Sequence, residues 1–299
     1  MDKYFFRKTF YKNNLTRFDD FKIEIPSSIT IEGNYLSDDK IPELRIELDN
    51  IGKIICNKLI NSKNIFFSDL IQWMKSIFPT TSLDTLYTDI KLFLISMNQK
   101  GILNFFPIER ASFIGILLWK YQNLKNDTRI RYDIQGKNKF GNFCEIFKYV
   151  FKENVFPIAF IIIAELIVVY LLKNYIKIWN ANFLLLLLPL YIYLNLLISL
   201  VIRETVHLIV YRSIMKNFSG YLVLRRFTFS IIRGKLRKSL SIKVRASGAV
   251  FTVLLGIILY LLSKELWVRI PAVIFLFHII NLLPIFGDGY EIVKELLSH

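Results

Sequence analysis

Cysteine is scarce in this chain of 299 residues, and its two members, Cys56 and Cys144, lie far apart. They form no Cys-x-x-Cys pair, so the sequence has neither a dithiol redox motif nor a paired-cysteine zinc motif. Both thiols are expected to be buried and structural. Internal repeats and low-complexity tracts are also lacking. The N-terminus opens with mixed charge in place of an apolar run, so no signal peptide is expected.

Long apolar runs, by contrast, fill the second half of the chain. Hydrophobic residues make up 54% of the sequence, above the roughly 45–50% usual for soluble domains. Residues 1–150 have the pattern of soluble protein. The later apolar runs are each close to the roughly 20 residues needed to cross the hydrocarbon core of a bilayer. The expected transmembrane helices are residues 155–172, 183–202, 246–262 and 270–286.

Positively charged residues predict the orientation of these helices. Residues 211–245 hold ten Lys and Arg and no acid, whereas residues 173–182 and 263–269 hold two each. Short loops rich in Lys and Arg stay in the cytoplasm. The sequence therefore predicts a multi-pass protein of the bacterial cell membrane with both termini cytoplasmic. The net charge of +15 is explained by topology and by contact with anionic lipid.

The first hundred residues have the pattern of a small α+β domain. Alternation predicts strands at residues 21–25, 28–31 and 44–48, and Gly101 precedes a closing strand at 102–106. Apolar residues at helical spacing predict three helices between the third and the closing strand. This order is typical of a winged-helix domain, which we place at residues 1–106.

Charge argues against nucleic acid as the ligand of this domain. Residues 18–106 contain nine Lys and Arg against twelve Asp and Glu, a net charge of −3. A phosphate-binding surface needs the opposite sign. A peptide that adds as an extended strand to a sheet edge fits better. A domain for dimerisation or regulation is the alternative, and a membrane-tethered transcription regulator is a weaker one.

The domain resembles the PqqD-like family, which recognises the leaders of ribosomally made, post-translationally modified peptides. The resemblance lies in residues 48–55, in the short helix after them and in residues 93–103. It implies a leader lying along the third strand and the third helix. The peptide-binding residues implied are Arg45, Ile46, Glu47, Leu48, Leu86 and Ile90.

Residues 107–152 are expected to connect the two parts. Residues 108–124 are predicted to form a helix, and residues 126–142 are polar and rich in turn formers. Residues 143–152 are amphipathic and aromatic, which is typical of a helix at the bilayer surface. Residues 153–299 are then the four-helix membrane domain.

Two polar clusters at the ends of apolar runs carry the candidate chemistry. Ionisable residues are costly inside a bilayer and usually face the interior of a helix bundle. The first cluster is Arg203-Glu204-Thr205-Val206-His207, and the second ends at Asp288. By the predicted topology both lie at the cytoplasmic face. A zinc protease needs three protein ligands, a water and a carboxylate base, and Glu-x-x-His supplies the base and one ligand.

The second cluster resembles the site-2 protease family (peptidase M50) of intramembrane zinc metalloproteases. Asn281, Pro284, Asp288 and Gly289 match its Asn-x-x-Pro and Asp-Gly marks, and residues 246–250 resemble its small-residue motif. The resemblance implies that Glu204 activates water, that His207 and Asp288 hold zinc and that Asn281 binds the substrate backbone. The whole chain resembles the peptide zinc metalloproteases of modified-peptide gene clusters.

Arg203 departs from the family pattern, because it stands where His-Glu-x-x-His has its first ligand. Guanidinium has no lone pair for a metal. The Pro-to-Asp spacing is also one residue shorter than the common form. Three outcomes are open: Glu165 or His278 completes the zinc shell, a metal binds through fewer ligands, or Arg203 pairs with Asp288 or Glu165 in an inactive centre. His278 alone is more typical of a hydrogen-bonded bundle residue.

The sequence thus predicts a membrane-embedded zinc endopeptidase that recognises and cleaves the leader of a modified peptide. The alternative is a catalytically inactive membrane partner that binds a precursor peptide, an exporter or an immunity target. The expected partners are the precursor peptide, the lipid bilayer and an ABC exporter, and nucleic acid is not expected.

Overall fold

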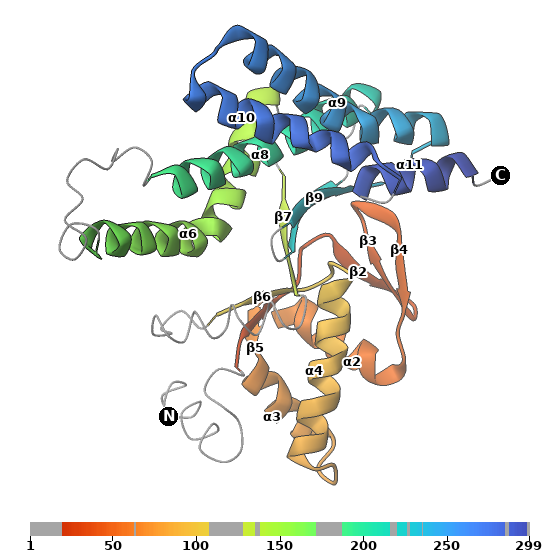
Figure 1. Cartoon of the computed structure of the whole chain (residues 1–299). Coiled ribbons are helices and arrows are strands. Elements are labelled where there is room, and N and C mark those ends of the chain that lie inside the picture. The colour runs from red at the N-terminus through yellow and green to blue at the C-terminus, as the bar shows by residue number, and fades with distance from the viewer. Residues whose placement is uncertain are drawn as a thin grey trace. The chain divides into compact units, whose positions relative to one another are not determined.

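A computed structural model describes residues 20–62, 64–107, 128–134, 138–171, 187–215, 220–225, 228–234, 236–284 and 287–297. The chain forms two compact units (Figure 1). Unit 1 comprises Met1–Asp133 and Ser219–Gly234, and unit 2 comprises Ile134–Phe218 and Lys235–His299. These bounds differ from the expected domains, because a strand from the connection and a segment from the basic loop fold with the N-terminal part. The expected helix at 108–124 lies outside the described residues.

Unit 1 is built around one apolar core. β1 (Lys22–Glu24) lies between β5 (Asn64–Phe66) and β6 (Asn104–Phe106), antiparallel to both. Three helices pack with this sheet: α2 (Asn50–Ser62), α3 (Phe67–Ile77) and α4 (Leu83–Gln99). The predicted order of strands, three helices and a closing strand is confirmed, with β5 as an additional strand.

A second antiparallel sheet has the order β2–β3–β4. Its strands are β2 (Ile29–Glu32), β3 (Tyr35–Asp38) and β4 (Ile41–Glu47). Gly33 forms the β2–β3 turn with φ +64°, a conformation that glycine adopts without strain. β4 contains Pro42, which has no N–H to donate. Within the described residues β4 pairs only with β3, so it is an edge strand.

The basic loop expected at residues 211–245 contains a folded hairpin. β8 (Gly220–Arg225) and β9 (Thr228–Arg233) pair with each other, and β8 also pairs with β7 (Arg129–Asp133). Asn98 and Asn104 hold β7 in place, because their side chains form hydrogen bonds with the backbone of Arg129 and Arg131. The prediction of a loop is therefore wrong in part, because residues 220–225 and 228–233 form strands that belong to unit 1.

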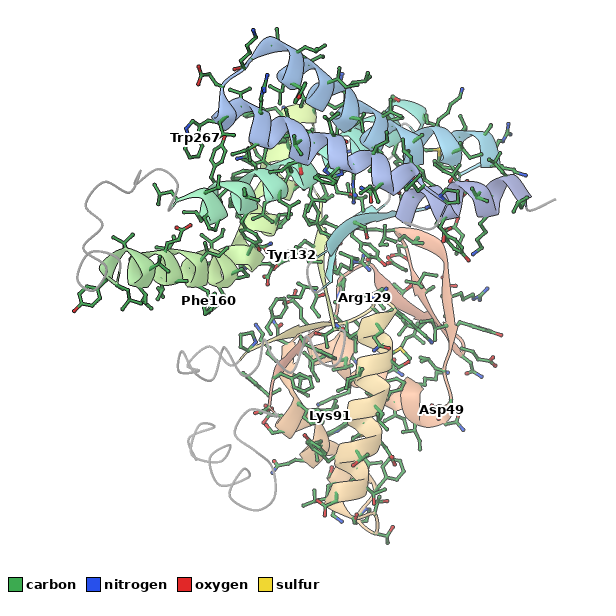
Figure 2. The ribbon with its side chains drawn as sticks, viewed as in Figure 1. Asp49, Lys91, Arg129, Tyr132, Phe160 and Trp267 are labelled. Atoms are coloured by element: carbon green, nitrogen blue, oxygen red, sulfur yellow. The ribbon has the colours of Figure 1, made fainter. Side chains whose placement is uncertain are left out.

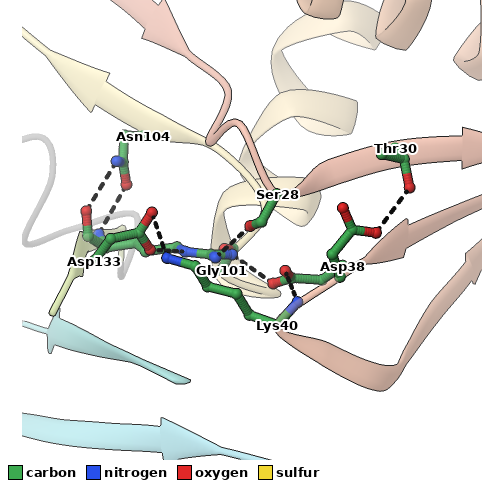
Figure 3. A network of polar contacts seen from close by, with 9 residues as sticks. Ser28, Thr30, Asp38, Lys40, Gly101, Asn104 and Asp133 are labelled. Carbon is green, nitrogen blue, oxygen red and sulfur yellow. Dashed lines mark hydrogen bonds and ion pairs between the residues drawn. The ribbon is translucent and has the colours of Figure 1, made fainter. Parts of the chain in front are cut away.

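A buried ion pair joins β7 to β3, and Figure 3 shows the polar contacts around it. Nη1 of Arg131 lies 2.6 Å from Oδ2 of Asp38, and these two side chains are 1% and 0% exposed. The same guanidinium donates to Ser28 at 2.8 Å and stacks on the ring of Tyr221 at 3.6 Å from its centroid. Tyr221 lies on β8, so the stacking joins the β8–β9 hairpin to Arg131 of β7 and, through Arg131, to Asp38 of β3.

Unit 2 contains three helices that are long and apolar enough to cross a membrane. They are α6 (Lys139–Leu171), α8 (Leu188–Ile214) and α9 (Lys238–Leu262). On α6, Phe160 is 72% exposed and points away from the helix (Figure 2), as expected of a side chain solvated by lipid. These helices indicate a membrane protein. The amphipathic residues 143–152 are the first part of α6 and not a separate helix.

The structure does not confirm the fourth expected span. α10 (Leu266–Leu276) changes to 3₁₀ geometry in η2 (Phe277–Leu282), and together they make a shorter apolar segment than the other three. Tighter 3₁₀ turns are used in short pieces and often mark a functional position. A final helix, α11 (Gly287–Leu297), follows. Residues 270–282 of the predicted run lie in α10 and η2.

The two cysteines differ in environment, which corrects the expectation that both are buried. Cys56 is buried in the core of unit 1, whereas Cys144 is exposed on α6. Burial, and secondarily the charge of Asp49, raises the pKa of Cys56 to about 12. Thiolate is the reactive form. We therefore expect iodoacetamide at pH 8 to label Cys144 alone in the native chain and both cysteines in denaturant, as measured by mass spectrometry of the peptides.

The same pKa shift has a consequence at high pH. The pKa of Cys56 in the unfolded chain is near 9.0, whereas burial raises the pKa of the folded thiol to about 12. Its contribution to stability is therefore complete below pH 9 and is lost as the pH rises toward 12. Labelling of native Cys56 at pH 8 would contradict the buried environment.

Candidate functional site

α8 carries the first polar cluster in the middle of an apolar helix. Glu204 and His207 are 4% and 3% exposed, and one helical turn separates them, so both lie on one face of α8. That face packs against α9. The base and the ligand expected of Glu-x-x-His therefore lie on the same side of α8.

Arg203 forms an ion pair with its neighbour. Nη2 of Arg203 lies 2.7 Å from Oε1 of Glu204, and Nε donates to the same oxygen at 3.0 Å. The two side chains are 14% and 5% exposed. The predicted partners were Asp288 or Glu165. Asp288 also attracts the guanidinium electrostatically, but the hydrogen-bonded partner is the carboxylate expected to activate water.

His207 is held in one orientation by α9. Its Nδ1 donates to the carbonyl of Val244 at 2.6 Å, so the lone pair of the neutral ring lies on Nε2. A carbonyl in this role fixes the ring tautomer, as at many metal sites. Nε2 is buried and has no hydrogen-bond partner among the described residues. It lies 3.5 Å from Oδ2 of Asp288.

Gly248 lets α9 approach the imidazole. A Cβ at this position would lie 2.5 Å from Nε2 of His207 and 2.8 Å from the carbonyl oxygen of Arg203. Only glycine fits such a contact between two helices. The small-residue run at 246–250, noted in the sequence, therefore has a steric reason in this chain.

α11 brings the second cluster to the first. Asp288 is in its first turn, and Glu291 and Glu295 lie one and two turns further on. Arg245 on α9 forms ion pairs with both glutamates, at 3.7 Å and 3.4 Å. Ser241 donates to Glu295 at 2.7 Å. These contacts hold α11 on α9 and so position Asp288, and only the i, i+4 spacing of the two acids could have indicated them in the sequence.

His278 uses both ring nitrogens in hydrogen bonds. Nδ2 of Asn281 donates to Nδ1 at 3.1 Å, so Nδ1 is the acceptor. The other nitrogen, Nε2, then donates to Oγ of Ser199 at 3.0 Å. Neither nitrogen keeps a lone pair for a metal. The hydrogen-bonded role that the sequence favoured for His278 over a ligand role agrees with these contacts, and Asn281, expected to bind the substrate backbone, is one of its partners.

Glu165 accepts a hydrogen bond at the start of α8. Its Oε1 accepts the backbone N–H of Leu190 at 2.9 Å, in the first turn of α8. The first N–H groups of a helix have no partner within it, and a carboxylate there also suits the helix dipole. Glu165 is thus a helix cap in this structure, which corrects its expected roles as metal ligand and as counter-ion of Arg203.

The donors that remain do not fit a catalytic zinc site. Such a site takes three protein ligands, and this centre offers Nε2 of His207 and the carboxylate of Asp288. Among the described residues no three His, Cys, Asp or Glu side chains come close enough together to hold a metal. The expected base, Glu204, is bonded to a guanidinium in place of facing a water ligand.

The expected peptide-binding residues of unit 1 fall into two sets. Arg45 and Glu47 are exposed on β4, and Ile46 between them is half-buried. Leu48, Leu86 and Ile90 are 5%, 7% and 3% exposed and belong to the core. The expected contribution of these three side chains to a peptide groove is therefore corrected, because they hold α4 and the end of β4 in the domain.

Comparison of the chain with protein-family models, with curated proteins and with solved structures gave no match.

Proposed function

We propose that the chain is a membrane-bound partner that captures the leader of a ribosomally made, modified peptide through unit 1 and does not hydrolyse it. The observation that carries this proposal is the outer edge of β4, which among the described residues pairs with no further strand. A strand edge presents unpaired N–H and C=O groups to which an extended peptide can add. The PqqD-like resemblance supplies the class of peptide.

The backbone directions on β4 specify which residues would bind the peptide. The N–H of Leu48 donates to the carbonyl of Asn34, so the backbone groups of Leu48 and Ile46 point toward β3. Successive residues of a strand point their backbone groups to opposite sides. Arg45 and Glu47 therefore direct their N–H and C=O groups to the outer edge, where a peptide would pair with them.

Replacing Arg45 by proline tests this pairing. Arg45→Pro removes one outward N–H and leaves the bonds to β3 in place, and edge strands tolerate proline. We expect affinity to fall about tenfold, the upper end of what one lost hydrogen bond contributes. Fluorescence anisotropy with a labelled leader peptide from the same gene cluster and the full chain in detergent would measure it.

The matched control is Arg45→Ala, which keeps the N–H and removes only the side chain. We expect this variant to bind within a few-fold of the wild type. Equal loss in both variants would mean that the side chain, and not the strand edge, recognises the peptide. Wild-type affinity in both would place the peptide elsewhere on the protein.

A zinc endopeptidase that cleaves the same leader is the second candidate, and one observation favours it. The unpartnered Nε2 of His207 faces the carboxylate of Asp288 at 3.5 Å, as two ligands of one ion would. This function needs a third ligand and a Glu204 released from Arg203. We therefore rank it second. In either case we propose a bacterial cell membrane location with both termini cytoplasmic, and an ABC exporter as a further partner.

A further inference from the structure

We infer that the guanidinium of Arg203 supplies the positive charge of the membrane centre, in the place that a metal ion would take. The membrane centre is Arg203, Glu204, His207 and Asp288. The inference rests on the proposed function, in which unit 2 does not hydrolyse the peptide. Its first support is the two-point contact of Nε and Nη2 of Arg203 with one oxygen of Glu204. A guanidinium keeps its charge at any physiological pH.

The surroundings of this guanidinium require a positive charge. Two carboxylates, Glu204 and Asp288, attract Arg203 electrostatically, and Glu204 is 5% exposed on its side chain. A buried carboxyl group such as that of Glu204 stays ionised only with a cationic partner or a metal, and otherwise it takes up a proton. Arg203 supplies that charge from within the chain. A divalent ion added beside it would face a like charge in a medium of low dielectric constant.

The rest of the centre retains the geometry of a metal site. Nδ1 of His207 is fixed by the Val244 carbonyl, and its Nε2 faces Asp288 at 3.5 Å. Positions 203 and 207 are four residues apart on α8, the spacing at which two histidines share one ion. A single replacement, Arg203→His, would therefore remove the competing charge and provide the third ligand together.

Zinc content of the purified full chain in detergent tests this inference. Each protein is stripped with EDTA, incubated with zinc, desalted and analysed by mass spectrometry of the metal. We expect the wild type to retain no stoichiometric zinc and Arg203→His to retain about one ion per chain, as a three-ligand site would. Zinc should also raise the Tm of Arg203→His and leave that of the wild type unchanged. Arg203→His with His207→Ala should lose both effects.

Two further variants decide the question if Arg203→His does not fold. Arg203→Met removes the charge and Arg203→Lys keeps it, so we expect Tm to fall more for methionine than for lysine, with no rescue by zinc. One zinc per wild-type chain, lost in His207→Ala, overturns the inference and favours the endopeptidase. Equal melting of Arg203→Met and the wild type also overturns it, as does a folded Arg203→His without zinc. Peptide capture by β4 is measured separately and stands or fails on its own.

Discussion

Replacing Arg131 by methionine is expected to lower the free energy of unfolding of unit 1 by about 3–5 kcal/mol, the cost of leaving a buried charge without its partner. Asp38 is 0% exposed on its side chain and lies 2.6 Å from the guanidinium. The change also removes the bond to Ser28 and the stacking on Tyr221. Native-state hydrogen exchange of β7 and β8, in the full chain in detergent, would measure the loss.

Lys40→Met is the matched control for this variant. Lys40 forms an ion pair with Asp133 at 2.8 Å, but its side chain is 32% exposed. Exposed pairs contribute about 0–1 kcal/mol, so little change is expected. Combining Arg131→Met with Asp38→Leu removes both charges and should recover much of the stability. If Arg131→Met alone costs no more than Lys40→Met, the pair does not hold the hairpin on unit 1.

The strands and helices of unit 1 were predictable where their patterns are local. The alternating residues of β2 and the helical spacing in α4 specify which face is buried. The β8–β9 hairpin was not predictable in this way. In the sequence, β7 lies within a polar connection and β8 within a basic loop. Their pairing joins segments about ninety residues apart, as in Arg131 with Val223. Burial of Arg131 becomes favourable only once Asp38 is beside it.

The membrane centre was likewise predictable from the sequence only in part. The Glu-x-x-His pattern indicated Glu204 and His207 as a pair, and the expected topology placed Asp288 near them. The bonded partner of Arg203 was not predicted, because adjacent residues on a helix do not usually face each other. The long arginine side chain reaches back to Glu204 all the same. Nor does sequence reveal which nitrogens of His278 are bonded, since that depends on Ser199 from another helix.

The second large effect is expected at Gly289, which follows Asp288 in the first turn of α11. A Cβ there would lie 2.1 Å from the carbonyl oxygen of Leu283 and 2.6 Å from that of Leu282. These are backbone atoms and cannot rotate away, so Gly289→Ala must displace α11. We expect a loss of about 3 kcal/mol, the upper end of the range for overpacking. Thermal unfolding of the full chain in detergent would measure it.

The displacement should also separate Asp288 from His207, which can be measured directly. In a chain carrying His207→Cys and Asp288→Cys, with Cys144→Ser to remove the exposed thiol, we expect a short bifunctional thiol reagent to cross-link the two cysteines. The tips of the two native side chains approach to 3.5 Å, but cysteine is shorter than histidine, so the reagent spans the gap and a direct disulfide is not required. Adding Gly289→Ala should abolish the cross-link, whereas Tyr290→Ala, which truncates a neighbouring side chain that is 55% exposed, should leave it intact. A cross-link that survives Gly289→Ala would show that α11 is not the element that brings Asp288 to His207.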